Sequence, residues 1–145
     1  MSTVAPTSPD WHALSVGQDL PPLSLDITAT HIVAGAIATR DFMPVHHDRD
    51  YAQAQGAPDI FMNILSTNAH CSRWLTDWAG PDAMVRHLAI RLGVPLMPRA
   101  TLTFTGTITG LEADGDDGRV DIEFRAATDI GDHVTGTATV TLPLG

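Results

Sequence analysis

The sequence predicts an α+β domain in which an antiparallel sheet wraps around one long central helix. From residue 62 or 63 to residue 79, apolar side chains recur at spacings of three, four and seven, and Gly80-Pro81 ends this helical pattern. Apolar and polar residues then alternate in four segments, 85–92, 101–111, 119–128 and 133–142. Because alternation gives each strand one apolar face, we expect that face to cover the helix and the other to meet water.

The chain before the long helix is predicted to begin with a tail, a strand and a short helix. Residues 1–16 contain little to bury, so we expect a flexible tail, followed by one folded domain over residues 17–145. Alternating apolar residues up to Ile27 predict a short first strand. Thr28 or Thr30 is placed to cap the helix that follows.

Turn signals and a second capping residue define the remaining elements. Asp48 is placed to cap a helix over residues 49–55, which Gly56 would stop. Turn residues at 115–118 and 129–132 separate the later alternating segments. Together with the alternation, they predict that these strands form an antiparallel meander.

Composition narrows the possible functions. The formal charge is −9, and all eight basic residues are arginine, so an acidic chain without a basic patch argues against nucleic acid as a partner. No apolar run approaches the roughly 20 residues of a membrane-spanning helix. The start of the sequence lacks the features of a signal peptide, so a cytoplasmic location is expected. Cys71 is the single cysteine and is interpreted as a buried thiol of the helix.

The segment from Asp41 to Asp48, Asp-Phe-Met-Pro-Val-His-His-Asp, contains the strongest chemical signal. Asp41 and His46 stand five residues apart around a proline, a spacing that can direct a carboxylate and an imidazole at one water for acid–base chemistry. The structural alternative is that Asp41 is an ordinary turn carboxylate. We expect His47 to face solvent or support the loop. A metal site is disfavoured because adjacent residues rarely converge on one ion, and no metal is predicted.

This segment resembles the signature of the MaoC-like (R)-specific enoyl-CoA hydratases, which have the hotdog fold. Their pattern is Asp, any residue, Asn, Pro, any residue, His, any residue, Asp, and here Met43 replaces the Asn. A second match, residues 91–102, resembles a strand, a proline-containing turn and the next strand of that family. The family's His-Gly pair before the helix appears here as Phe61-Met62. The resemblance covers roughly residues 17–142.

The resemblance implies a reaction and roles for particular residues. Asp41 and His46 would hold the water that adds across the double bond of a 2-enoyl thioester. Main-chain N–H groups of Met62 and Asn63, at the positive end of the long helix, would stabilise the thioester oxygen. Arg91 and Arg99 flank the second match and would meet the phosphates of coenzyme A, which is part of the substrate; no separate cofactor is expected.

Residues 57–65, with 76–81, resemble a narrower branch, the small MaoC-like subunits of actinobacterial hydratases that act on CoA thioesters of shortened steroid side chains. That resemblance implies a heteromer with a second MaoC-like hotdog chain, or otherwise a homodimer, since a small sheet exposes unpaired edge strands. Two other functions remain open. One is a hotdog acyl-CoA thioesterase, and the other a non-catalytic assembly or binding subunit, which Met43 and Phe61-Met62 favour.

Overall fold

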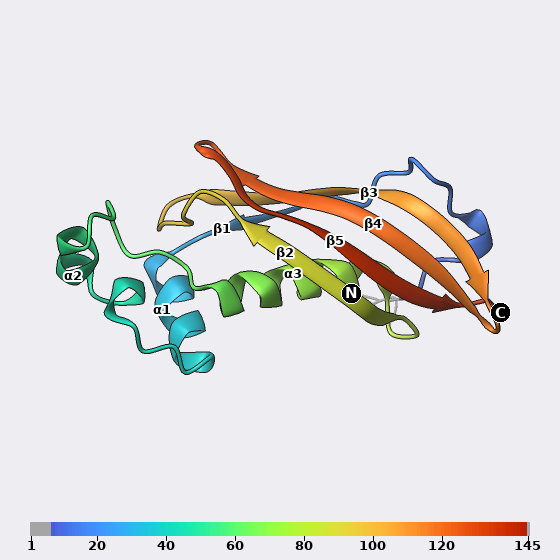
Figure 1. Cartoon of the computed structure of the whole chain (residues 1–145), viewed down its shortest axis with the longest axis horizontal. Helices are drawn as coiled ribbons and strands as arrows, with labels where there is room; N and C mark the ends of the chain where they lie inside the picture. The colour runs from blue at the N-terminus through green and yellow to red at the C-terminus, as the bar shows by residue number, and fades with distance from the viewer. Residues whose placement is uncertain (1–6, 145) are drawn as a thin grey trace, which may run out of the picture.

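The computed structural model describes residues 7–144, in which one long helix lies along a curved antiparallel sheet (Figure 1). The elements, in chain order, are η1 (Trp11–Ala13), β1 (Leu23–Asp26), α1 (Ala29–Ala38), η2 (Pro44–His46), α2 (Arg49–Ala54), α3 (Ile64–Ala79), β2 (Met84–Leu92), β3 (Thr101–Asp114), β4 (Asp117–Thr128) and β5 (Gly131–Pro143). The long helix, the short helices and the five strands therefore confirm the predicted fold class.

The strand order is β1-β3-β4-β5-β2, and every neighbouring pair is antiparallel. The last three strands form the predicted meander, but β2 is not part of it: it pairs with β5 at one edge, whereas β3 pairs with β1. The prediction for β2 is thereby corrected. A tight hairpin needs roughly two to five residues, whereas the connection over 93–100 is longer and contains Pro95 and Pro98. It carries the chain from one edge strand to the other side of the sheet.

The core lies between α3 and the inner face of the sheet. Trp74 of α3 is 2% exposed and stacks on Phe104 of β3, with ring centroids 5.7 Å apart. Gly106 permits this approach, because a Cβ at that position would lie 2.6 Å from the indole of Trp74. Cys71 is fully buried, and burial raises the pKa of its thiol to about 12, which agrees with its interpretation as a structural residue.

The predicted tail is corrected over part of its length. Trp11 packs on Gly118, and its indole N–H donates to the carbonyl oxygen of Arg119 at 3.2 Å. An indole ring buries a large apolar area and needs a partner for its N–H, and β4 offers both. Residues 1–6 of the predicted tail lie outside the described residues. Within residues 7–144, none of the helices is both long and apolar enough to cross a bilayer.

Helices α1, η2 and α2 lie toward the N-terminal end of α3 (Figure 1). Thr28 caps α1 and Asp48 caps α2, as predicted, each by accepting a main-chain N–H three residues ahead. Helix α1 crosses α3 closely where Gly35 faces Ser66. The loop between α1 and α2, which contains the Asp41 to Asp48 segment, is therefore held over the first turn of α3.

Candidate active site

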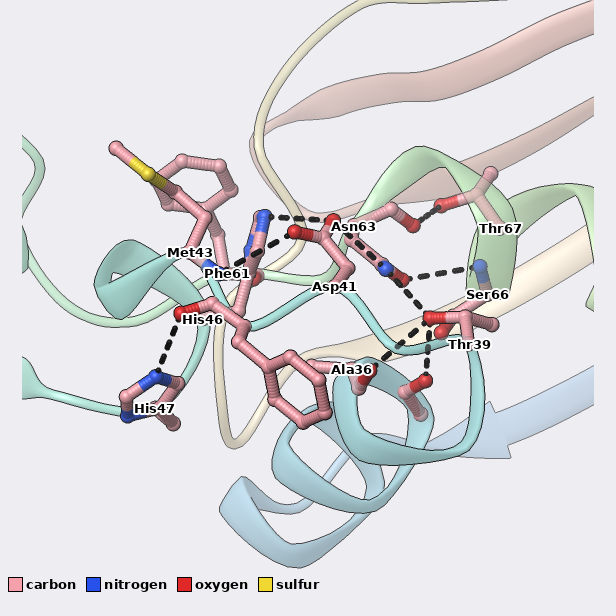
Figure 2. Close-up of polar contacts among 12 residues, drawn as sticks. Ala36, Thr39, Asp41, Met43, His46, His47, Phe61, Asn63, Ser66 and Thr67 are labelled. Carbon is pink, nitrogen blue, oxygen red and sulfur yellow. Dashed lines mark hydrogen bonds and ion pairs between the residues drawn. The ribbon is translucent and has the colours of Figure 1, made fainter.

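Asp41 is held between the end of α1 and the start of α3 (Figure 2). Its main-chain N–H donates to the carbonyl oxygen of Ala36 at 2.9 Å. The side-chain amide of Asn63 donates to its Oδ2 at 2.9 Å, and the N–H of Met43 donates to Oδ1 at 3.3 Å. The carboxylate is therefore bonded from two helices and from its own loop.

His46 is oriented by the chain segment just before α3. Its Nδ1 lies 2.7 Å from the carbonyl oxygen of Phe61, and the phenyl ring packs edge-on against the imidazole. A carbonyl oxygen only accepts hydrogen bonds, so Nδ1 carries the proton. In the neutral imidazole, Nε2 is then an acceptor, and it lies 3.4 Å from Oδ2 of Asp41.

This geometry brings two acceptor atoms to one point. The side chain of His46 is 10% exposed and that of Asp41 is 29% exposed, so solvent reaches both side chains. Two acceptors at this separation repel unless a donor bonds both, and a water molecule has the two O–H groups required. The predicted convergence of Asp41 and His46 is thus present in the structure.

The surroundings favour the ionised form of Asp41. The hydrogen bond from Asn63 is the largest influence and lowers the pKa of the carboxyl, and the N–H of Met43 and the nearby His46 act in the same direction. Partial desolvation opposes them, but the pKa remains below its ordinary value. At neutral pH the carboxylate is therefore ionised and can accept a hydrogen bond from water.

His47 does not share this site. Its Nε2 lies 3.2 Å from the carbonyl oxygen of Phe42, and the ring points away from Asp41 (Figure 2). Within residues 7–144, no group of three or more histidine, cysteine or acidic side chains is arranged to hold a metal ion.

The structure corrects one of the two predicted oxyanion donors. The main-chain N–H of Met62 donates to the carbonyl oxygen of Leu96 at 2.9 Å, so it is not free for a substrate. The connection between β2 and β3 passes close to the start of α3 and takes this donor. The N–H of Asn63, the capping residue of α3, forms no hydrogen bond within residues 7–144 and is the remaining candidate donor.

Arg91 and Arg99 do not share a site within one chain. Arg91 lies on β2, at one edge of the sheet, in a shallow groove on the outer face. Arg99 lines a different cavity of about 310 Å³ beside β1, at the other edge. The second arginine of that cavity is Arg49, which the sequence did not indicate and whose Nε donates to Asp59 at 2.9 Å.

The contacts that orient Asp41 and His46 come from residues at or just before the start of α3. The sequence predicted a main-chain role for Asn63, and the structure adds a bond from its side chain to Asp41. Phe61 acts through its carbonyl oxygen, and a main-chain group has no residue-type signal.

Known proteins with a similar sequence or a similar structure share this architecture. No family model matches the chain. The chain is 45% identical over 127 residues to the 3-oxo-4,17-pregnadiene-20-carboxyl-CoA hydratase beta subunit of Mycobacterium tuberculosis, covering 88% of this chain and 95% of the relative.

Two solved structures are also similar. A chain of the ChsH1-ChsH2 complex from Mycobacterium tuberculosis is 44% identical with a TM-score of 0.82, covering 88% of this chain and 98% of that one. The (R)-hydratase from A. caviae involved in PHA biosynthesis is 25% identical with a TM-score of 0.80, covering 90% of this chain and 98% of that one. This chain belongs to the MaoC-like enoyl-CoA hydratase family with the hotdog fold, which confirms the resemblance of its motifs.

Proposed function

We propose that this chain hydrates a 2-enoyl-CoA thioester to the 3-hydroxyacyl-CoA, with Asp41 and His46 activating the water. The observation that carries the proposal is the 3.4 Å approach of Nε2 of His46 to Oδ2 of Asp41, two acceptors that one water can bridge. The membership of the chain in a hydratase family supports the same reaction.

The proposed reaction uses each group in turn. The water oxygen forms a bond to the β-carbon while one of its protons passes to Nε2 of His46. Asp41 accepts a hydrogen bond from the second O–H and so orients the water. Electron density moves to the thioester oxygen, which the free N–H of Asn63 stabilises. His46 then returns the proton to the α-carbon. An acid–base pair of this kind typically contributes about 10² to 10⁴ in rate.

We infer that the substrate is bulky and that a second hotdog chain completes its pocket. The chain's relative is named for a pregnadiene-carboxyl-CoA, and the similar structure is a complex of two proteins. Apolar side chains of the Asp41 loop and of the first turn of α3 are exposed in the isolated chain: Met43 is 47% exposed, and Ile64 and Leu65 are 52% and 49% exposed. Exposed apolar residues around a site favour coverage by a partner or a substrate.

Arg99 and Arg49 are the proposed contacts for the CoA phosphates. Both line the same cavity, and Asp59, which bonds Arg49, lies two residues before Phe61, whose carbonyl orients His46. The cavity and the acid–base pair are thus joined by one short segment. Arg91 is expected to reach a CoA only across an interface between chains, since it lies on the opposite edge strand.

A hydration assay with matched variants tests the proposed reaction. The protein, alone and co-expressed with a MaoC-like partner, is assayed with short-chain and steroid-bearing enoyl-CoAs by loss of enoyl-thioester absorbance. Asp41→Asn and His46→Gln should each abolish hydration, whereas His47→Gln should not. Full activity in either of the first two variants contradicts the mechanism, and release of free thiol without a 3-hydroxy product indicates a thioesterase.

A truncated substrate tests the phosphate contacts separately. Arg99→Ala and Arg49→Ala should raise KM for the CoA thioester and leave kcat nearly unchanged, because the phosphates are remote from the reacting carbons. The same variants should match the unmodified protein with a pantetheine thioester, which lacks the nucleotide phosphates. Equal losses with both substrates would exclude a phosphate contact.

A further inference from the structure

The side chain of Asn63 uses every hydrogen-bonding atom of its amide at the start of α3 (Figure 2). Its Oδ1 accepts the main-chain N–H of Ser66 at 3.0 Å, which caps the helix. Its Nδ2 donates one hydrogen to Oδ2 of Asp41 at 2.9 Å and the other to the hydroxyl oxygen of Thr39 at 2.8 Å.

This arrangement fixes which way the amide points. The N–H of Ser66 is a donor and must meet the amide oxygen, so the NH₂ group must face Asp41 and Thr39. The hydroxyl of Thr39 passes its own hydrogen to the carbonyl oxygen of Gly35 at 2.8 Å. Asn63 is 2% exposed, so bulk water does not compete for these bonds.

We propose that Asn63 is a positioning residue that holds the Asp41 carboxylate with Oδ2 directed at His46. The proposal rests on the proposed hydration, in which Asp41 orients the water. The carboxylate could otherwise rotate about its Cβ–Cγ bond, since its remaining side-chain bond, from the N–H of Met43 to Oδ1, is longer, at 3.3 Å. Met43 stands at the motif position where the family has Asn, and the amide beside Asp41 belongs to the capping residue of α3.

The positive end of the α3 helix dipole acts on Asp41 through the side-chain amide of Asn63. The N–H groups in the first turn of α3 form the positive end of the helix dipole, and one of them polarises the amide of Asn63 by donating to its oxygen. The polarised NH₂ group is a stronger donor to the carboxylate. Loss of this donor should therefore raise the pKa of Asp41 as well as free its rotation.

The titratable surroundings of Asp41 are simple. His46 of η2 faces it at 3.4 Å, whereas the groups bonded to it from α1 and from the start of α3, the main-chain carbonyl of Ala36 and the amide of Asn63, are neutral. A change at Asn63 that alters the pH dependence therefore acts on the pair of Asp41 and His46.

Two substitutions separate capping from positioning. Asn63→Ser and Asn63→Asp both keep a good helix-capping oxygen for the N–H of Ser66. Asn63→Ser removes the NH₂ donor. Asn63→Asp places a second carboxyl group against Asp41, and the two share one proton, so that the protonated introduced group can donate as the amide did.

The readout is kcat/KM of each variant divided by that of the unmodified protein, measured between pH 5 and pH 8 in the complete enzyme complex. At pH 8 both ratios should be reduced by about tenfold or more, because small misplacements of a reacting group are costly. On acidification the Asn63→Asp ratio should rise, whereas the Asn63→Ser ratio should not. Activity of Asn63→Ser within twofold of the unmodified protein, or a flat Asn63→Asp ratio, would overturn the proposal.

A titration without turnover keeps this proposal distinct from the proposed function. The carboxyl carbon of Asp41, followed by ¹³C NMR, should titrate at a higher pH in Asn63→Ser than in the unmodified protein. An unchanged titration would overturn the positioning role. A raised pKa in a protein without hydratase activity would contradict the proposed reaction and leave the role of Asn63 intact.

Discussion

Gly35→Ala tests how tightly the crossing of α1 and α3 holds the site. A Cβ at Gly35 would lie 2.3 Å from Oγ of Ser66 and 3.1 Å from its Cβ, whereas ordinary contact begins at 3.4 Å. The helices must therefore separate by about 1 Å or the hydroxyl must rotate away. Such overpacking costs about 1–3 kcal/mol, and the gain in helix propensity returns at most about 1 kcal/mol.

The expected result is a net loss of about 1–2 kcal/mol, which lowers Tm by about 3–6 °C for a chain of this length. The hydration rate should fall by more than this loss of folded protein explains. Helix α1 supplies the carbonyl of Ala36 to the N–H of Asp41, so a shift of the helix moves the carboxylate. A misplacement of about 1 Å can cost about 100-fold in rate.

Ser66→Ala is the matched control and the route to rescue. The hydroxyl of Ser66 is buried and has no hydrogen-bond partner within residues 7–144, so its removal should leave Tm nearly unchanged. Added to Gly35→Ala, it should recover part of the lost Tm and hydration rate, both measured at one protein concentration. A Gly35→Ala protein as stable and active as the unmodified one would refute this reasoning, as would strict additivity of the two changes.

Three further experiments test the packing of the core and the pKa of a buried histidine. Cys71 should not react with a thiol reagent at pH 8 until the chain unfolds, because burial raises its pKa to about 12; rapid native labelling would contradict its burial. Gly106→Ala should lower stability by about 1–3 kcal/mol, because its Cβ would meet Trp74, and an unchanged denaturation midpoint would exclude that contact. Burial lowers the pKa of His133, so the unfolded chain binds its proton first as pH falls. The free energy of unfolding should therefore decrease from pH 7 to pH 5, and it should do so less in His133→Gln; equal slopes would refute the assignment.

The elements that could be predicted from the sequence are those with local signals. Helix α3 and strands β3 to β5 have a clear period, and Thr28 and Asp48 are capping residues read from neighbouring positions. The pairing partner of β2 has no such signal, because it depends on where a long connection crosses the sheet. The packing of Trp11 on β4 is likewise a contact between distant parts of the chain.

In the candidate site, too, neighbouring residues could be predicted from the sequence and contacts between distant segments could not. Asp41 and His46 lie on one loop, so their spacing in the sequence alone indicates that they form a pair. The roles of Asn63 and Met62 depend on contacts with α1 and with Leu96, from segments far away in sequence. A capping position specified that Asn63 begins a helix, but it did not specify which acceptors its NH₂ group would meet.

The stereochemistry of hydration in D₂O tests the central claim most directly. If His46 takes the proton from the water that Asp41 holds and returns it to the α-carbon, oxygen and deuterium must add to the same face of the double bond. NMR of the 3-hydroxyacyl product should then show syn addition alone. Anti addition, or a mixture of the two diastereomers formed before any exchange at the α-carbon, would contradict a single water shared by these two side chains.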